Sequence, residues 1–174
     1  GLAEKGISVI PPGMFGHTSD VRQYEYNPDR ARELLREAGL ADGFNTSVNV
    51  LNAGYAPDVF AVIQSNLRDV GIDLNINLVD PPTWSNTFNT GDAPMVILLT
   101  TRMIPDQILT QFFYGPNCAP AGDNFSCWDS ADELIAQARV ELDDQKRAEL
   151  YRQIQQLFME ELPGLPLMTN RQMD

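Results

Sequence analysis

The chain has 174 residues, of which 43% are apolar and 21% are charged, and its formal net charge is −12. This length suits one globular domain with a core of its own, and no apolar run approaches the roughly 18 residues of a membrane span. The negative field repels phosphate backbones and anionic lipids, so we expect no nucleic-acid partner.

The first 26 residues predict an irregular lead-in. Two prolines and two glycines in "IPPGMFGH" (10–17) interrupt any regular element there. The lead-in also lacks the charged, apolar and small-residue layout of an export signal. The chain is therefore either cytoplasmic or a mature or excised piece of a protein whose export signal lies elsewhere.

The stretch "NPDRARELLREAGL" (27–40) predicts a helix with both ends marked. Asn27 is a good N-cap, Pro28 suits the first helical position because its missing N–H costs nothing there, and Gly39 suits the C′ position. The apolar residues recur at helical spacing and predict a face turned toward a core: Ala31, Leu34, Leu35 and Ala38.

The middle of the chain predicts alternating strands and helices. The segments 44–52 and 72–80 alternate apolar and polar residues like strands, and the segment 56–70 has apolar residues at helical spacing. A short helix begins near Pro82. Met95 to Leu99 are five consecutive apolar residues, the pattern of a strand that is buried on both faces.

The C-terminal third predicts two more helices. "SADELIAQARVEL" (130–142) begins with Ser130 and has Glu133 three residues later, which is the pattern of a capping box. A longer helix follows over roughly 143–162, and "PGLPLMTN" (163–170) predicts a short extended segment.

This alternation predicts an α/β fold with helices packed on a mainly parallel sheet, as a single domain over residues 1–174. In such sheets ligands gather just beyond the carboxyl ends of the strands. Two polar segments occupy such positions: Thr100 to Met103, after the apolar strand, and Asn52 to Tyr55, after the strand at 44–52.

Two cysteines, Cys118 and Cys127, flank a segment rich in Pro, Gly and Asn that can fold back on itself. A disulfide between them would stabilise the fold by about 2–4 kcal/mol and would place the chain outside the reducing cytosol. The alternative is two unlinked thiols. A metal site is not expected, because the chain has one histidine and four ligands are normally needed.

Nucleophilic catalysis has little support in the sequence. The one histidine, His17, lies in the lead-in and is typical of a surface or loop-packing residue. No G-x-S-x-G elbow, Walker-type loop or G-x-G-x-x-G is present. The acid pairs Asp143/Asp144 and Glu160/Glu161 lie at a helix start and a helix end, and Asp143 suits an N-cap better than an acid–base role. We expect no enzyme and no cofactor.

The two tryptophans, Trp84 and Trp128, leave two interpretations open. Each is either a residue on which a ligand stacks or an anchor of the core or of a loop.

The chain contains, in this order, "IPPGMFGH", "YNPDRARELLREAGLADGF", "AVIQSNLRDVGIDLNINLVD", Trp84, "GDAPMVILL" and "NFSCWDSADELIAQARVELDDQKRAELYRQIQQLFMEELPGLPL". Together these segments resemble the C-terminal lobe of the extracytoplasmic solute-binding proteins of family 5, the dipeptide/oligopeptide-type receptors of ABC importers. The resemblance covers nearly the whole chain, and its motifs are specific in combination, although any one alone would be an ordinary helix.

The resemblance implies a two-lobed full-length protein that encloses its ligand between the lobes. This chain would be the C-terminal lobe, with the N-terminal lobe and the export signal outside it. The expected ligand is a small molecule or peptide, bound without catalysis. The expected location is periplasmic or otherwise extracytoplasmic, with an ABC permease in the membrane as the wider partner and a monomer as the state in solution.

One loop departs from the pattern of the family. Peptide-binding relatives usually carry "G-W-x-x-D-Y-P-D-P" there, and its first Asp takes the α-ammonium group of the ligand. Aligned on Pro105, this chain has Thr100 at the Trp position and Met103 at the Asp position. The ammonium anchor is therefore missing, and Arg102 stands one residue before it. A guanidinium favours a carboxylate or a phosphate as its partner.

For Arg102 the alternative is a surface salt bridge with an acid such as Asp106 or Asp92. Two other functions also remain open: a stand-alone α/β enzyme domain with an unrecognised active site, and a ligand-sensing interaction domain. The candidate ligand-binding residues are Thr100, Thr101, Arg102, Met103, Asn52 and Asn124.

Overall fold

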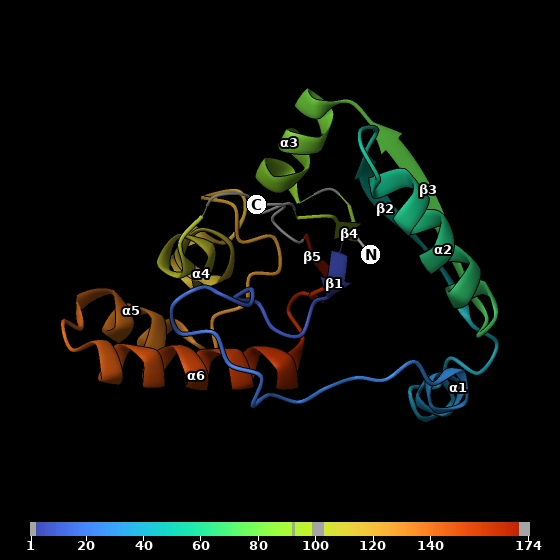
Figure 1. Ribbon diagram of the computed structural model, residues 1–174. Coiled ribbons are helices and arrows are strands. Elements are labelled where there is room, and N and C mark those ends of the chain that lie inside the picture. Colours follow the sequence, from blue (N-terminus) through green and yellow to red (C-terminus); the bar gives the residue numbers. More distant parts are fainter. Residues whose placement is uncertain (1–2, 92, 99–102, 171–174) are drawn as a thin grey trace. The chain divides into compact units, whose positions relative to one another are not determined.

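The computed structural model describes residues 3–91, 93–98 and 103–170 (Figure 1). Its elements are β1 (Ala3–Lys5), α1 (Pro28–Glu37), β2 (Phe44–Leu51), α2 (Ala56–Arg68), β3 (Ile72–Val79), α3 (Pro81–Thr90), β4 (Met95–Val96), α4 (Pro105–Phe113), the 3-10 helix η1 (Gly115–Asn117), α5 (Asp132–Val140), α6 (Asp144–Glu161) and β5 (Met168–Asn170). Helices with a parallel sheet confirm the predicted α/β class. Within the described ranges, no helix combines the length and the apolar character that a membrane crossing requires.

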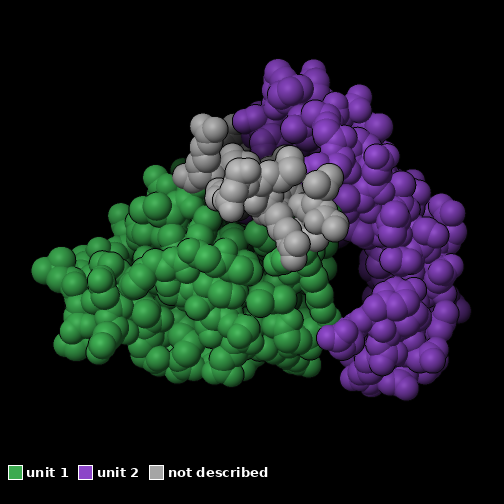
Figure 2. Space-filling view, in the orientation of Figure 1, with its two compact units in different colours: residues 1–24, 100–174 green, residues 25–99 purple. Residues whose placement is uncertain are grey.

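The chain divides into two compact units (Figure 2). The helical unit comprises Gly1–Tyr24 with Thr100–Asp174, and the sheet unit comprises Glu25–Leu99. The sheet unit holds the three-stranded sheet β3-β2-β4, and the helical unit holds the two-stranded sheet β1-β5. The single domain expected over residues 1–174 stays a prediction.

In the sheet unit, β2 lies between β3 and β4, and both pairings are parallel. β2 and β3 pair in register over the eight residues of each strand. α2 lies along these two strands (Figure 1). Phe60 of α2, Val48 of β2 and Leu74 of β3 are buried. The strands predicted from alternation at 44–52 and 72–80 are confirmed by β2 and β3.

The prediction of a strand buried on both faces at 95–99 is wrong for residues 95–98, and Leu99 lies outside the described residues. β4 is only Met95–Val96, it lies at the edge of the sheet, and Met95 is 37% exposed. The next residue, Ile97, is buried but lies outside the strand, and its carbonyl accepts the indole N–H of Trp84 at 3.1 Å. Five apolar residues in a row predict burial in general, whereas the number of neighbouring strands depends on the tertiary fold.

The helix α1 has the predicted ends but not the predicted core-facing side. Asn27 caps it by accepting the N–H of Arg30 at 2.9 Å, and Gly39 follows it with a φ of +75°. No residue of α1 is buried, and Leu34 is 49% exposed. The caps are local features, whereas the burial of a stripe needs a packing partner elsewhere in the fold.

An aromatic cluster forms the core of the helical unit. Phe113 of α4 and Phe158 of α6 meet edge to face with ring centroids 4.8 Å apart, and Trp128 meets Phe158 at 5.7 Å. Trp128 is therefore a core anchor, one of the two roles left open for it. The helix α4 was not predicted, although Pro105 at its first position is a recognised start signal.

The two C-terminal helices begin differently. α6 begins as predicted with Asp143, whose carboxylate accepts two backbone N–H groups of the first turn. The predicted capping box of Ser130 and Glu133 is wrong, because the N-cap of α5 is Ala131 and has no side-chain cap. Ser130 Oγ instead donates to Glu161 Oε2 of α6 at 2.7 Å. Ala131 itself is fully buried.

The lead-in is less irregular than predicted. β1 pairs antiparallel with β5, with Lys5 beside Met168, so the extended segment expected at 163–170 has a partner. Three residues are too few to show a periodic pattern, which is why the sequence did not predict β1.

Candidate functional site

The carboxyl ends of three parallel strands meet at one edge of the sheet in the sheet unit. β2 ends at Leu51 and β3 at Val79, and the N–H of Asn52 donates to the carbonyl of Val79 at 2.9 Å. β4 ends at Val96 at the same edge, and the next carbonyl, that of Ile97, accepts a hydrogen bond from Trp84 Nε1. Asn52, a predicted ligand residue, is thus placed at the expected edge, and its side chain is exposed.

The helix α3 begins at this edge with a fixed negative charge. Asp80 Oδ1 accepts the N–H of Thr83 at 2.8 Å and caps the helix. The hydroxyl and the N–H of Thr83 lower the pKa of the Asp80 carboxyl, so this group stays ionised. Sequence reasoning missed Asp80 as an N-cap, although the acid before Pro81 is the signal that could have found it.

The polar segment expected after β4 is described only in part. Thr100, Thr101 and Arg102 lie outside the described residues, so their ligand-binding role stays a prediction. Met103 is half-buried and immediately precedes the N-cap residue of α4, Ile104.

The first turn of α4 engages one of the acids considered as a partner for Arg102. Asp106 lies 3.7 Å from Arg139 of α5, measured from Oδ1 to Nε, and it also accepts the hydroxyl of Thr110 at 3.5 Å. The other acid considered, Asp92, lies outside the described residues. Asp106 therefore already has a cation beside it, and the salt-bridge alternative for Arg102 stays a prediction.

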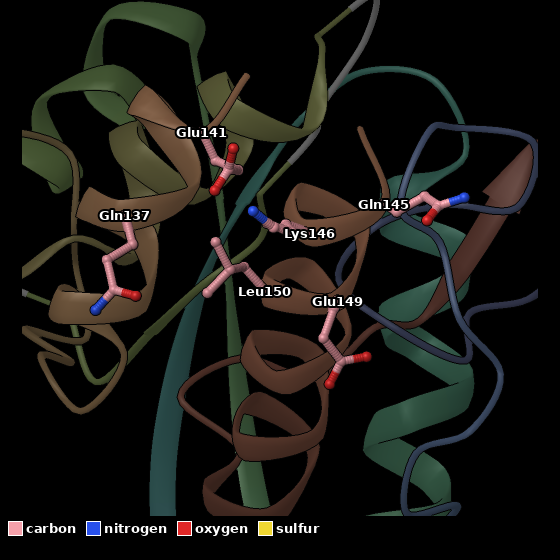
Figure 3. Close-up of a pocket in the computed structure, with 6 residues that line it drawn as sticks. All are labelled: Gln137, Glu141, Gln145, Lys146, Glu149 and Leu150. Carbon is pink, nitrogen blue, oxygen red and sulfur yellow. The ribbon is translucent and has the colours of Figure 1, made fainter. Parts of the chain in front are cut away.

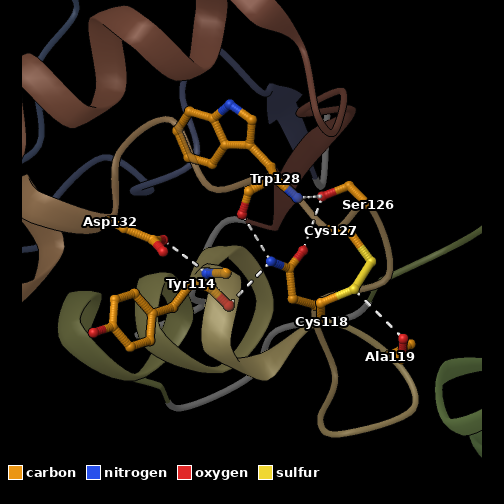
Figure 4. The surroundings of a disulfide bond; sticks show 9 residues. Tyr114, Cys118, Ala119, Ser126, Cys127, Trp128 and Asp132 are labelled. Carbon is orange, nitrogen blue, oxygen red and sulfur yellow. Dashed lines mark hydrogen bonds between the residues drawn. A yellow bond between two sulfur atoms is a disulfide. The ribbon is translucent and has the colours of Figure 1, made fainter.

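The candidate Asn124 has a structural role inside the cysteine loop (Figure 4). It is fully buried, and its Nδ2 donates to the carbonyls of Tyr114 at 3.1 Å and Trp128 at 2.9 Å. Its Oδ1 accepts the hydroxyl of Ser126 at 3.0 Å. The amide therefore joins the end of α4 to the loop, and its ligand-binding role stays a prediction.

The predicted disulfide is confirmed (Figure 4). Cys118 and Cys127 are bonded, with their Cα atoms 4.5 Å apart. Backbone bonds close the same loop, since the N–H of Asn124 donates to the carbonyl of Asn117 at 2.8 Å. The cross-link and the hydrogen bonds thus hold the loop together.

A shallow hollow lies between α5 and the start of α6 (Figure 3). Its lining residues are Gln137, Glu141, Gln145, Lys146, Glu149 and Leu150. Arg152 and Gln153 donate to Glu149 and lower the pKa of its carboxyl to about 2. This lining offers no Ser, Thr, Cys or His as a nucleophile or base, and it includes none of the predicted ligand residues.

Two further observations concern catalysis and metals. His17 Nδ1 lies 2.7 Å from the carbonyl of Ile10, so the histidine packs within the lead-in, one of the two settings expected for it. Across residues 3–91, 93–98 and 103–170, the His, Cys, Asp and Glu side chains form no group of three or more that could hold a metal ion.

The model of the family "Bacterial extracellular solute-binding proteins, family 5 Middle" matches residues 1–122 of the chain. The chain is 32% identical over 177 residues to Di/tripeptide-binding protein 2 of Pseudomonas aeruginosa (strain UCBPP-PA14). It is 31% identical over 176 residues to Dipeptide-binding protein of Escherichia coli (strain K12). Each alignment covers 95% of this chain but 32% of the relative, so the chain spans about a third of the length of these relatives.

A solved structure of similar fold is that of the PBP/SBP MoaA in complex with mannopinic acid, from A. tumefacien R10. It matches with a TM-score of 0.87 and 28% sequence identity. The match covers 97% of this chain and 35% of that chain.

Proposed function

The chain belongs to the bacterial extracellular solute-binding proteins of family 5, and we propose that it is the C-terminal lobe of a receptor that binds a small solute for an ABC importer without catalysis. The observation that carries the proposal is the family match over residues 1–122 of the 174. Two relatives named for binding dipeptides or tripeptides add support. A parallel sheet with polar groups at its carboxyl edge is compatible with a ligand there.

The remaining parts of such a receptor follow from the same proposal. The N-terminal lobe of the full-length protein supplies the other wall of the ligand site, and a permease in the membrane receives the solute. The receptor acts as a monomer outside the cytoplasm. The bond between Cys118 and Cys127 supports this location, because disulfides persist in oxidising compartments.

The ligand of this receptor carries an acidic or neutral group where peptide ligands usually carry a free amine. Met103 stands at the position of the ammonium-binding Asp in the family pattern and cannot balance a positive charge. Arg102 beside it favours a carboxylate or a phosphate. Asp106 is one of the acids that could otherwise pair with Arg102, and it already lies beside Arg139. This ion pair supports the role of Arg102 in binding the ligand. The similar structure of MoaA was solved with mannopinic acid, an acidic solute.

The proposal is tested on the full-length receptor purified from its native host. Native mass spectrometry should find a bound small solute, and calorimetry should detect binding of alanyl-alanine, N-acetyl-alanyl-alanine or mannopinic acid. A receptor that retains no solute and binds none of the three probes contradicts the proposed function.

The ligand chemistry is tested with the same three probes. We expect N-acetyl-alanyl-alanine to bind at least as tightly as alanyl-alanine, because the Asp that binds the free amine in peptide-binding relatives is replaced by Met103 in this chain. Arg102→Ala should weaken the tightest-bound probe by about tenfold or more, the effect of losing a hydrogen bond to a charged group. Arg68→Ala, which removes an exposed arginine at the end of α2, is the control. A clear preference for the free amine, or equal effects of both substitutions, contradicts this ligand chemistry.

A further inference from the structure

A defined contact ties the backbone next to Met103 to the first turn of α4. Ile104 occupies the N-cap position, and isoleucine has no side-chain acceptor with which to cap a helix. Gln107, at the third helical position, supplies the other half of a capping box, because its Oε1 accepts the N–H of Ile104 at 3.2 Å. The backbone is thus held one residue beyond Met103.

The first turn of α4 is a firm base for this contact. Pro105 is buried, and the following turn buries Ile108 and Leu109 in the core of the helical unit. Asp106 adds an ion pair with Arg139 of α5. In contrast, Ile104 is 59% exposed, so packing of its own side chain does little to fix its position. The carbonyl of Ile104 accepts the N–H of Ile108 at 3.1 Å, which holds the residue on the side of the helix. On the side of Met103, the hydrogen bond from the N–H of Ile104 to Gln107 supplies the corresponding constraint.

We propose that Gln107 is a positioning residue for ligand binding: it holds the N–H of Ile104 and so fixes the direction in which the chain runs from α4 toward Met103. The proposal rests on the proposed function, since Met103 aligns with the ligand anchor of the family. A binding group has to be held within about 0.5 Å of its productive position, and residues beside it usually supply that constraint. Gln107 supplies this constraint through its Oε1 atom, which accepts the N–H of Ile104.

The test compares four forms of the full-length receptor: the wild type, Gln107→Glu, Gln107→Met and Gln111→Met. Gln107→Glu keeps an acceptor at the same place, and a carboxylate in the first turn of a helix is favourable. Gln107→Met keeps the length of the side chain but removes the acceptor. Gln111→Met is the matched control, because Gln111 lies one turn later on α4 and donates to Asp123.

Two measurements are made on each form. Hydrogen exchange reports the protection of the Ile104 amide, and calorimetry reports the affinity for alanyl-alanine, N-acetyl-alanyl-alanine and mannopinic acid. We expect Gln107→Met to raise the exchange rate of this amide and to weaken the tightest-bound probe by about threefold to tenfold each, the effect of one lost hydrogen bond. Gln107→Glu should restore both values, and Gln111→Met should change neither.

Three results would overturn the proposal. They are an unchanged Ile104 amide in Gln107→Met, an equal loss of affinity in Gln111→Met, and a failure of Gln107→Glu to restore binding. If the wild type binds a probe and Gln107→Met binds it equally well, the positioning role fails while the proposed function stands. If the wild type binds no probe, the proposed function fails together with the ligand-binding part of the inference, and the amide exchange still decides whether Gln107 holds Ile104.

Discussion

Gln155 of α6 and Ser8 of the lead-in are joined by a buried hydrogen bond, in which Ser8 Oγ donates to Gln155 Oε1 at 2.8 Å. The same oxygen accepts the N–H of Thr18 at 3.3 Å. Gln155 Nε2 donates to the carbonyls of Gly16 at 2.7 Å and Tyr151 at 2.9 Å. One fully buried amide thus ties the lead-in to the longest helix of the described chain.

Gln155→Leu should destabilise the chain by about 2–4 kcal/mol, because it leaves buried partners such as Ser8 Oγ and the carbonyl of Gly16 without hydrogen bonds. Urea unfolding followed by circular dichroism measures this loss. Gln145→Leu, at an exposed position of α6, is the control and should change the free energy of unfolding by no more than about 0.5 kcal/mol. Equal midpoints for the two variants would show that the amide network contributes little.

We expect substitution by alanine to lower the free energy of unfolding by different amounts at two glycines of the lead-in. Gly13 and Gly16 have φ angles of +85° and +76°, a region that side chains rarely adopt. A Cβ on Gly13 would meet no atom within 4 Å, whereas a Cβ on Gly16 would overlap the ring of Tyr151. Gly13→Ala should cost about 1–2 kcal/mol from its backbone alone. Gly16→Ala should cost about 1–3 kcal/mol more from overpacking, and thermal unfolding that ranks them in the opposite order contradicts this.

The disulfide between Cys118 and Cys127 should be present in the protein isolated from its native host without reductant. Peptide mapping without reductant should recover Cys118 linked to Cys127. Replacing both with serine should lower the free energy of unfolding by about 2–4 kcal/mol, the usual effect of opening a short cross-linked loop. Two thiols that can be alkylated in the native, unreduced protein would refute the linkage.

The carboxyl of Glu161 predicts a pH dependence of stability. The indole N–H of Trp128 and then the hydroxyl of Ser130 donate to it and lower its pKa from the ordinary value of 4.5. A lowered folded pKa stabilises the fold above about pH 4.5, and this stabilisation is lost as the pH falls through the folded pKa. The stability advantage of the wild type over Glu161→Gln should therefore be full near pH 6 and vanish in strong acid.

Chemical unfolding at a series of pH values tests this sign. Ser130→Ala removes the second hydrogen-bond donor to Glu161. The free energy of unfolding of this variant should therefore depend on pH less than that of the wild type and more than that of Glu161→Gln. An advantage of the wild type that grows as the pH falls below 4.5 would contradict the predicted direction.

The helix ends were largely predictable from the sequence, because capping is local. Asn27 and Asp143 cap α1 and α6 as expected, since the acceptor and the N–H groups it serves lie within three residues of each other. The predicted capping box of Ser130 and Glu133 was wrong, because the Ser130 hydroxyl has another partner. Ser130 bonds Glu161, which lies 31 positions away, and no local pattern includes that partner.

The candidate site was predictable only in outline. The position of Asn52 beyond β2 follows from strand alternation, which the sequence displays. The hydrogen bond from Ile104 to Gln107 was not predictable in this way, because it depends on α4, a helix that was not predicted from the sequence. The side-chain bonds of Asn124 to Tyr114 and Trp128, ten and four residues away, were not predicted, and its role in ligand binding stays a prediction.

By itself the sequence determined the α/β class, the strands β2 and β3, the ends of α1 and α6 and the family, and it favoured the pairing of two nearby cysteines. All of these depend on periodicity, on contacts between residues close in the chain, or on motifs in a fixed order. Only the tertiary structure decided that β4 is a two-residue edge strand, that the stripe of α1 is not buried, and that Gln155 anchors the lead-in. Burial and long-range hydrogen bonds depend on which segments that are distant in the sequence contact each other in the fold. A local sequence pattern does not show these contacts.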